Sequence, residues 1–212
     1  QKFWIAFVLG AIFQVVGYIA RLACIHDLNN VTYYIVQTLF VLLAPVLYAV
    51  SIYSLLGKII SYVGADDLSP VRPTRITCIF VIGDIFSLFM QTTGGGMMAK
   101  GGDAANKGTN IVLIGLIIQI VFFFFFIFLT VVFHKRTRDW DMEGSEGNWK
   151  LLLKILEACS LLIFIRSMYR VIEYAQGFTG YLITHEVYLY VLDALPMLAV
   201  QILFNVVHPG TV

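Results

Sequence analysis

The residues IVLIGLIIQIVFFFFFIFLTVVFH, Ile111–His134, form an apolar run that contains no Asp, Glu, Lys or Arg. A helix needs about 20 such residues to cross the hydrocarbon core of a bilayer. The rest of the chain is similar in character, because 59% of its residues are hydrophobic and only 13% are charged. Soluble domains contain about 45–50% apolar and about 25% charged residues. The composition therefore predicts a protein that crosses the membrane several times.

Six helical spans are predicted, and the alternating segments of about 10 residues that build membrane barrels are absent. The spans are about Phe3–Ile25, Tyr33–Ile60, Ile76–Gly94, Ile111–His134, Leu151–Tyr174 and Val187–Val207. The expected fold class is an all-α polytopic helix bundle, with residues 1–212 forming one domain. Pro45 lies inside the second span, where we expect a kink and a neighbouring group that satisfies the carbonyl freed by proline.

Lys and Arg are unevenly distributed among the loops. The stretches after the second and fourth spans are basic, whereas the other loops hold only Lys100 and Lys107. Because cytoplasmic loops are enriched in Lys and Arg, we expect the basic stretches, Gln1 and Val212 to be cytoplasmic. The nine residues that this topology places on the cytoplasmic side are Lys2, Lys58, Arg72, Arg75, Lys135, Arg136, Arg138, Lys150 and Lys154.

The stretch TTGGGMMAKGGDAANKGTN, Thr92–Asn110, is rich in glycine. We expect it to be a mobile external connection, with a lid as the alternative reading.

Motifs of several enzyme classes are missing. The chain contains no GxxxxGK[ST], HExxH or GxSxG pattern. Its three cysteines lie far apart, and its four histidines fall at the two membrane rims, so no three reach one point. We therefore predict neither an enzyme nor a cofactor nor a metal site. A net charge of +1 without a basic tract gives no indication of nucleic-acid binding.

Charged residues inside the spans are the candidates for function, because they are costly to bury in hydrocarbon. In LLIFIRSMYRVIEY, Leu161–Tyr174, the residues Arg166, Arg170 and Glu173 are spaced i, i+4 and i+7 and share one helical face. The last span repeats this spacing, and the residues expected on its face are Glu186, Tyr190, Asp193 and Met197.

Counting from the external connection predicts which of these residues meet. Arg166 lies seven residues before Glu173, and Asp193 lies seven residues after Glu186, so both should be roughly 10 Å below the rim. We predict an Arg166–Asp193 pair, since pairing lowers the cost of burying either charge. Arg21 and Gln91 also fall near outer ends of spans. Two interpretations remain open for this outer polar cluster, namely bracing of the bundle and lining of a substrate site.

Asp84 lies deeper in the third span and shares a face with Ser87 and Gln91. It is either a neutral, hydrogen-bonded group or a site for a proton or a ligand cation. On the fifth span, Glu157 is expected to pair with Lys154, three residues away.

Four blocks of sequence resemble the fungal lipid-translocating exporter family, which is named for aminocholesterol resistance and includes sphingoid long-chain-base exporters. They follow one another over nearly the whole chain. The blocks are VVGYIAR (Val15–Arg21), LLAPVLYAVSIYSLLGKII (Leu42–Ile60), IFVIGDIFSLFMQTTGGGM (Ile79–Met97) with GTNIVLIGLIIQ (Gly108–Gln119), and LIFIRSMYRVIEYAQGFTGYLITHEVYLYVLDALPM (Leu162–Met197) closed by HPG (His208–Gly210).

The resemblance implies a seven-span protein with an external N-terminus and a cytoplasmic C-terminus, in which the six predicted spans are the second to the seventh. It implies that the first span is missing before Gln1. The family pattern usually has Glu at the position of Gln14, so this chain departs from it there. The residues that the pattern marks are Tyr18, Arg21, Asp84, Gln91, Arg166, Arg170, Glu173, Glu186 and Asp193.

From the residues and the resemblance together we expect a protein that translocates or exports amphiphilic lipids, such as sphingoid bases, without an ATPase of its own. Its partners would be membrane lipids, and its location a plasma or internal membrane. The alternative is a seven-span sensor that binds an amphiphile and signals through cytoplasmic loops such as Lys135–Lys150. The sequence leaves both open.

Overall fold

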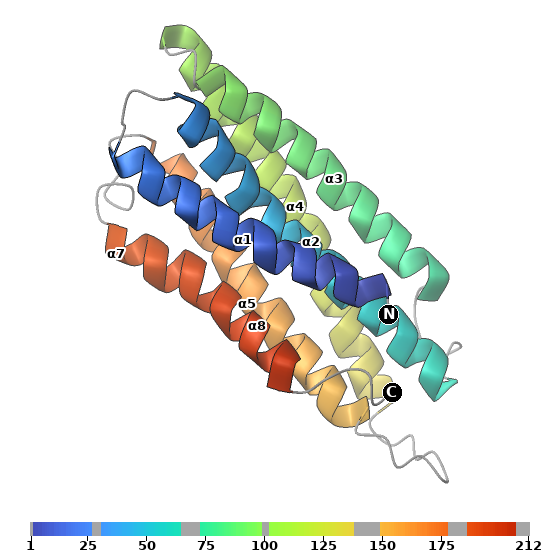
Figure 1. The fold of residues 1–212 in the computed structure, drawn as a ribbon. Helices are drawn as coiled ribbons and strands as arrows, with labels where there is room; N and C mark the ends of the chain where they lie inside the picture. Colours follow the sequence, from blue (N-terminus) through green and yellow to red (C-terminus); the bar gives the residue numbers. More distant parts are fainter. Residues whose placement is uncertain are drawn as a thin grey trace.

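A computed structural model describes residues 2–26, 31–64, 73–98, 102–137, 149–177 and 186–206. These residues form a bundle of helices that run along one long axis (Figure 1). The first five helices are α1 (Lys2–His26), α2 (Val31–Val63), α3 (Pro73–Met98), α4 (Gly102–Arg136) and α5 (Trp149–Ala175). The last span is built from α7 (Glu186–Leu189), a π-helical turn η2 (Tyr190–Ala194) and α8 (Leu195–Val206). The described part of the chain contains no β-strand, so the predicted all-α bundle is confirmed.

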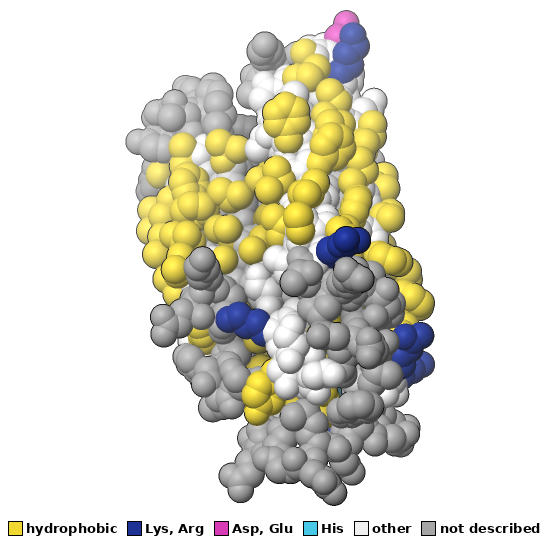
Figure 2. Space-filling model, turned by 90° about the vertical axis from the view of Figure 1, so that its right-hand side faces the viewer, with side chains coloured by type: hydrophobic (Ala, Val, Ile, Leu, Met, Phe, Trp, Pro, Cys, Tyr) yellow, Lys and Arg dark blue, Asp and Glu magenta, His cyan; other side chains and the backbone are white. Residues whose placement is uncertain are grey.

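Within the residues that the structure describes, five helices are long and apolar enough to cross a membrane, and α5 is not among them. It carries six charged residues, Lys150, Lys154, Glu157, Arg166, Arg170 and Glu173. It nevertheless packs against α2, α4 and α8, and its Arg166, Arg170 and Glu173 side chains are buried. Many large hydrophobic side chains remain exposed on the outside of the bundle, as Figure 2 shows for one face. Such an apolar exterior suits lipid and not water. The chain is a multi-pass membrane protein.

The core of the bundle centres on α2. Its side chains Tyr48, Ile52 and Tyr53 are fully buried. Close packing against α2 requires small residues, because a Cβ added at Gly17 of α1 would lie 2.8 Å from a methyl group of Val41. Small residues at contact points are the usual means by which membrane helices approach closely.

The prediction of a loop over Thr92–Asn110 is wrong for most of that stretch. Helix α3 continues to Met98 and α4 begins at Gly102. Gly94 and Gly108 serve packing here, since a Cβ at Gly94 would lie 2.6 Å from the carbonyl oxygen of Gly108 on the facing helix. Tertiary contact therefore overrides the weak helix propensity of glycine.

The last span contains one turn with an extra residue. The N–H of Leu195 donates to the carbonyl of Tyr190, five residues earlier, instead of four. Pro196 follows directly and has no N–H of its own, so the helix cannot keep its ordinary hydrogen bonds at this point. The wider turn changes which residues of the span face the core.

Candidate functional site

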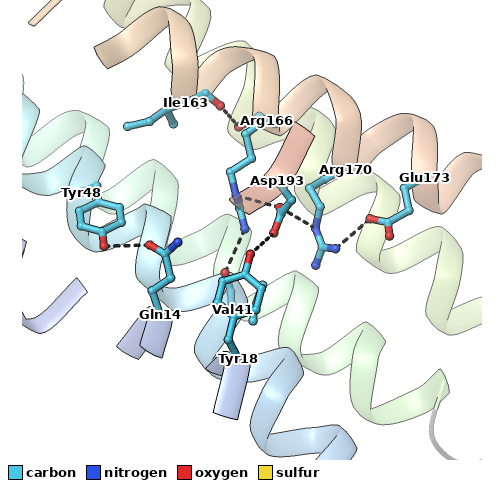
Figure 3. A network of polar contacts seen from close by, with 10 residues as sticks. Gln14, Tyr18, Val41, Tyr48, Ile163, Arg166, Arg170, Glu173 and Asp193 are labelled. Atoms are coloured by element: carbon cyan, nitrogen blue, oxygen red, sulfur yellow. Dashed lines mark hydrogen bonds and ion pairs between the residues drawn. The ribbon is translucent and has the colours of Figure 1, made fainter. Parts of the chain in front are cut away.

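Arg166 and Asp193 form a buried ion pair between α5 and the π turn. The Nε of Arg166 lies 2.9 Å from Oδ1 of Asp193, and the two side chains are only 6% and 1% exposed (Figure 3). The prediction that equal distance from the external connection would bring them together is confirmed. Pairing is essential here, because an isolated charge in an apolar interior is unfavourable by several kcal/mol or more.

Asp193 is the centre of a larger polar network (Figure 3). The hydroxyl of Tyr18, on α1, donates to its Oδ2 over 3.3 Å. The Nε of Arg170 lies 4.0 Å from its Oδ1, and Nη1 of Arg170 donates to Glu173 over 2.8 Å. Two guanidinium groups and two carboxylates thus balance in charge. The face that Arg166, Arg170 and Glu173 were predicted to share is confirmed, because all three side chains are buried together.

Proline supplies a further acceptor for Arg166. Pro45 has no N–H, so the carbonyl of Val41, four residues earlier, has no helical partner. The Nη2 of Arg166 donates to that carbonyl oxygen over 3.1 Å. The expectation that a neighbour satisfies the carbonyl freed by Pro45 is confirmed.

A cleft adjoins the ion pair. It has about 170 Å³ of empty space, part of it open to the surroundings, and its lining residues are Gln14, Tyr18, Val41, Ala44, Pro45, Arg166, Asp193 and Met197. The space in it that a water-sized sphere can occupy is only about 10 Å³, which is room for about one water molecule. The cleft is therefore too small, with its side chains in these positions, to enclose a headgroup or a long-chain lipid.

Tyr190 does not share the buried face of Asp193, contrary to prediction. Its side chain is 43% exposed, whereas Leu189 is buried. The extra residue of the π turn shifts the helical register, so Leu189 and not Tyr190 precedes Asp193 on the inner face. Glu186 begins α7, but its side chain lies outside the described residues. Arg21 is partly buried and follows Tyr18 by three residues on α1.

Asp84 and Gln91 occupy a different part of the bundle. The predicted common face with Ser87 exists, because all three side chains of α3 are buried. The hydroxyl of Tyr53 donates to Oδ2 of Asp84 over 2.9 Å, and Oδ1 has no hydrogen-bond partner among the described residues. Gln91 donates to Gln119 of α4 over 2.8 Å. These two polar contacts join α3 to α2 and to α4, and the structure places neither in the Asp193 network.

Aromatic rings enclose the Tyr53–Asp84 contact. The ring of Tyr53 lies 4.6 Å from that of Phe126 and 5.4 Å from that of Phe80, centroid to centroid. The run Phe122–Phe126 therefore supplies part of the core as well as exposed side chains.

Gln14, Tyr48 and Gln201 form a second polar cluster, which is not among the clusters expected from the sequence. Tyr48 donates to Oε1 of Gln14 over 2.9 Å, and Nε2 of Gln201 donates to the same oxygen over 3.0 Å. Gln201 also contacts the hydroxyl of Tyr48. One signal in the sequence was the i, i+4 spacing of Gln14 and Tyr18, which places both on one face of α1.

No three His, Cys, Asp or Glu side chains within the described ranges are close enough to hold a metal ion. Glu157 contacts His134 of α4 over 2.8 Å, so the prediction that it pairs with Lys154 is wrong. Glu157 thus has its partner on the neighbouring helix α4 and not on its own helix.

The sequence profile of a family described as "RTA1 like protein" matches residues 7–212. Protoporphyrin uptake protein 1 of Saccharomyces cerevisiae is 38% identical over 205 residues, which are 96% of this chain and 67% of that protein. Protein RTA1 of the same yeast is 39% identical over 209 residues, covering 97% of this chain and 65% of the relative. The sphingoid long-chain base transporter RSB1 of its strain Lalvin EC1118 is 29% identical over 251 residues, covering 99% and 65%. The chain thus spans about two-thirds of the length of these relatives. No solved structure matches it.

Proposed function

The chain belongs to the RTA1-like family, and from this membership we propose that it translocates an amphiphile with a cationic head, of the sphingoid-base class, across a fungal membrane. One named relative is a sphingoid long-chain base transporter. The observation that carries the proposal is the buried carboxylate of Asp193, which borders a small cleft between helices and is held by a phenol and two guanidinium groups.

Asp193 is the proposed ligand of the ammonium head. When the ammonium takes the carboxylate, Arg166 keeps the Val41 carbonyl as acceptor, and Arg170 keeps Glu173. Each guanidinium then keeps a hydrogen-bond acceptor, and Arg166 shares the Asp193 carboxylate with the ammonium. The apolar tail remains among lipid chains, because the cleft is too small for it. Arg21, Glu186 and Tyr190 are secondary candidates near the same end of the bundle, whereas Asp84 and Gln91 are proposed to hold helices together.

The distribution of Lys and Arg supports a topology in which the Asp193 cluster lies in the outer half of the membrane and the C-terminus is cytoplasmic. The plasma membrane is the proposed location, since export to the outside requires it.

Reconstitution tests the function. Full-length protein in liposomes should move a fluorescent sphingoid base between leaflets, and Asp193→Asn should slow this about tenfold or more, which corresponds to about 1.4 kcal/mol in the barrier. Asp103→Asn is the matched control, because it makes the same change at an exposed site in the first turn of α4.

Each of the other outcomes is informative. Binding of the base without movement by wild-type protein would support an amphiphile sensor instead of a translocator. Absence of both binding and movement would overturn the proposal. Equal rates for Asp193→Asn and wild type would remove Asp193 from the site.

A further inference from the structure

We propose that Gln14, Tyr48 and Gln201 form a second binding station, which receives the hydroxyl groups and the neutral amine of a headgroup after its ammonium has given a proton to the Asp193 carboxylate. This inference rests on the proposed function and extends it to a route. The route follows the seam between α1 and the last span, and it is defined by the side-chain contacts Tyr18–Asp193, Gln14–Gln201 and Phe7–Phe204.

The two stations share their helices and lie one below the other. Gln14 precedes Tyr18 by four residues, which is about 6 Å along α1. Gln201 follows Asp193 by eight residues, or about 12 Å along the last span. Gln14 and Asp193 both line the same small cleft, so a widening of this cleft by side-chain movement would bring a group bound at Asp193 to Gln14.

The chemistry of the second station differs from that of the first. It contains two amides and a phenol and no formal charge. The Nε2 of Gln14 has no hydrogen-bond partner among the described residues and is not sealed from its surroundings. In Figure 3 the amide nitrogen of Gln14 points toward the side on which Arg166 lies. Donors of this kind can replace water around a hydroxyl or amine, which would otherwise be unsatisfied in hydrocarbon.

Beyond the second station, α1 and the last span are in contact through buried aromatic side chains. Phe7 lies seven residues before Gln14, about 10 Å further along α1. Its ring is 5.2 Å from that of Phe204 and 5.2 Å from that of Tyr48, and both phenylalanine side chains are buried. Beyond the second station, the side-chain contact between α1 and the last span is therefore aromatic.

Substitution of Gln14 and Gln201 tests the second station. The double variant Gln14→Leu/Gln201→Leu should slow movement of a fluorescent sphingoid base in liposomes about tenfold or more. It should bind the base with wild-type affinity, because the Asp193 station is intact. Gln119→Leu is the control, since it breaks an inter-helical glutamine pair of the same chemistry between α3 and α4.

A reversible block separates a role in movement from a role in folding. Gln14→Cys/Gln201→Cys, with Cys24, Cys78 and Cys159 replaced by serine or alanine, can be bridged across the seam by a bifunctional thiol reagent with a cleavable disulfide. Bridging should stop movement of the base, and reduction should restore it.

The outcomes distinguish the inference from the function on which it rests. If wild-type protein does not move the base, both fail. If wild-type protein moves it and the double leucine variant or the bridged protein moves it equally fast, the second station is wrong and the translocator proposal stands. A variant that loses affinity as well as rate would also contradict a separate second station.

Discussion

Arg166 donates a hydrogen bond of 3.1 Å to the carbonyl oxygen of Val41, the group that Pro45 leaves without a helical partner. A proline in one helix and an arginine in another are therefore a single structural unit. The guanidinium satisfies a defect of α2 with one nitrogen and pairs with Asp193 through another. Lysine cannot do both in the same geometry, because it presents a single ammonium group.

This unit makes the effects of two substitutions depend on each other. Pro45→Ala restores an N–H that can bond to Val41, so Arg166 is no longer needed there. We expect Arg166→Lys to destabilise the wild-type protein more than the Pro45→Ala protein, by about 1 kcal/mol. Unfolding of the four proteins of this cycle in mixed detergent micelles measures the difference. Additive effects, within about 0.3 kcal/mol, would contradict the coupling.

Removing only one charge of the Arg166–Asp193 ion pair should destabilise the protein more than removing both charges. Asp193→Asn leaves the charge of Arg166 buried without its carboxylate, and we expect a loss of about 3 kcal/mol in unfolding free energy. Adding Arg166→Gln should recover part of this stability, while movement of a sphingoid base stays lost. A double variant less stable than Asp193→Asn would show that the pair is not the unit that determines stability.

Alanine substitution at the neighbouring residues Gly94 and Gly95 should have different effects on the stability of the protein. A Cβ at Gly94 would lie 2.6 Å from a backbone oxygen of α4, whereas a Cβ at Gly95 meets nothing within 4 Å. Gly94→Ala should therefore destabilise the protein by about 1–3 kcal/mol. Gly95→Ala should be neutral or stabilise it by up to about 1 kcal/mol, because alanine favours the helix. Thermal unfolding in detergent measures both variants, and equal effects would argue against close contact of α3 and α4.

Burial of the Asp84 carboxyl should be tolerated only while the hydroxyl of Tyr53 donates a hydrogen bond to it. Tyr53→Phe removes the donor to Oδ2 and leaves both oxygens without a partner, at a cost of about 1–3 kcal/mol. Tyr62→Phe removes a hydroxyl from an exposed tyrosine of the same helix and should change little. Replacing Asp84 by leucine in the Tyr53→Phe protein should restore stability if the unpaired carboxyl causes the loss. The unfolding midpoints of these variants in detergent decide the matter.

Positions along single helices were predictable from the sequence, and contacts between helices were predictable only in part. The depth of Arg166 and Asp193 followed from counting residues on either side of one connection, which works because the helical rise is constant. The same counting was wrong for Tyr190, because the π turn before Pro196 adds a residue that no periodicity reveals.

Other features depend on which helices are neighbours, and the sequence does not give that. The pairing of Glu157 with His134 requires that α4 and α5 lie side by side. The cluster of Gln14, Tyr48 and Gln201 joins three spans that are far apart along the chain. The glycine-rich sequence near Gly94 predicts a loop where the structure has helices, because glycine is typical both of close helix contacts and of flexible connections.

Helix α4 has 35 residues, which is about 52 Å at the usual rise, whereas the hydrocarbon of a bilayer is about 30 Å thick. Even a tilt of 40° leaves roughly 40 Å along the membrane normal. Its first turns carry exposed Asp103 and Lys107, so this end reaches past the acyl chains into the headgroups or the water. A spectroscopic label at Asn106 would therefore stand outside the membrane, away from the seam, and would give a fixed reference from which motion of α1 can be measured by distance.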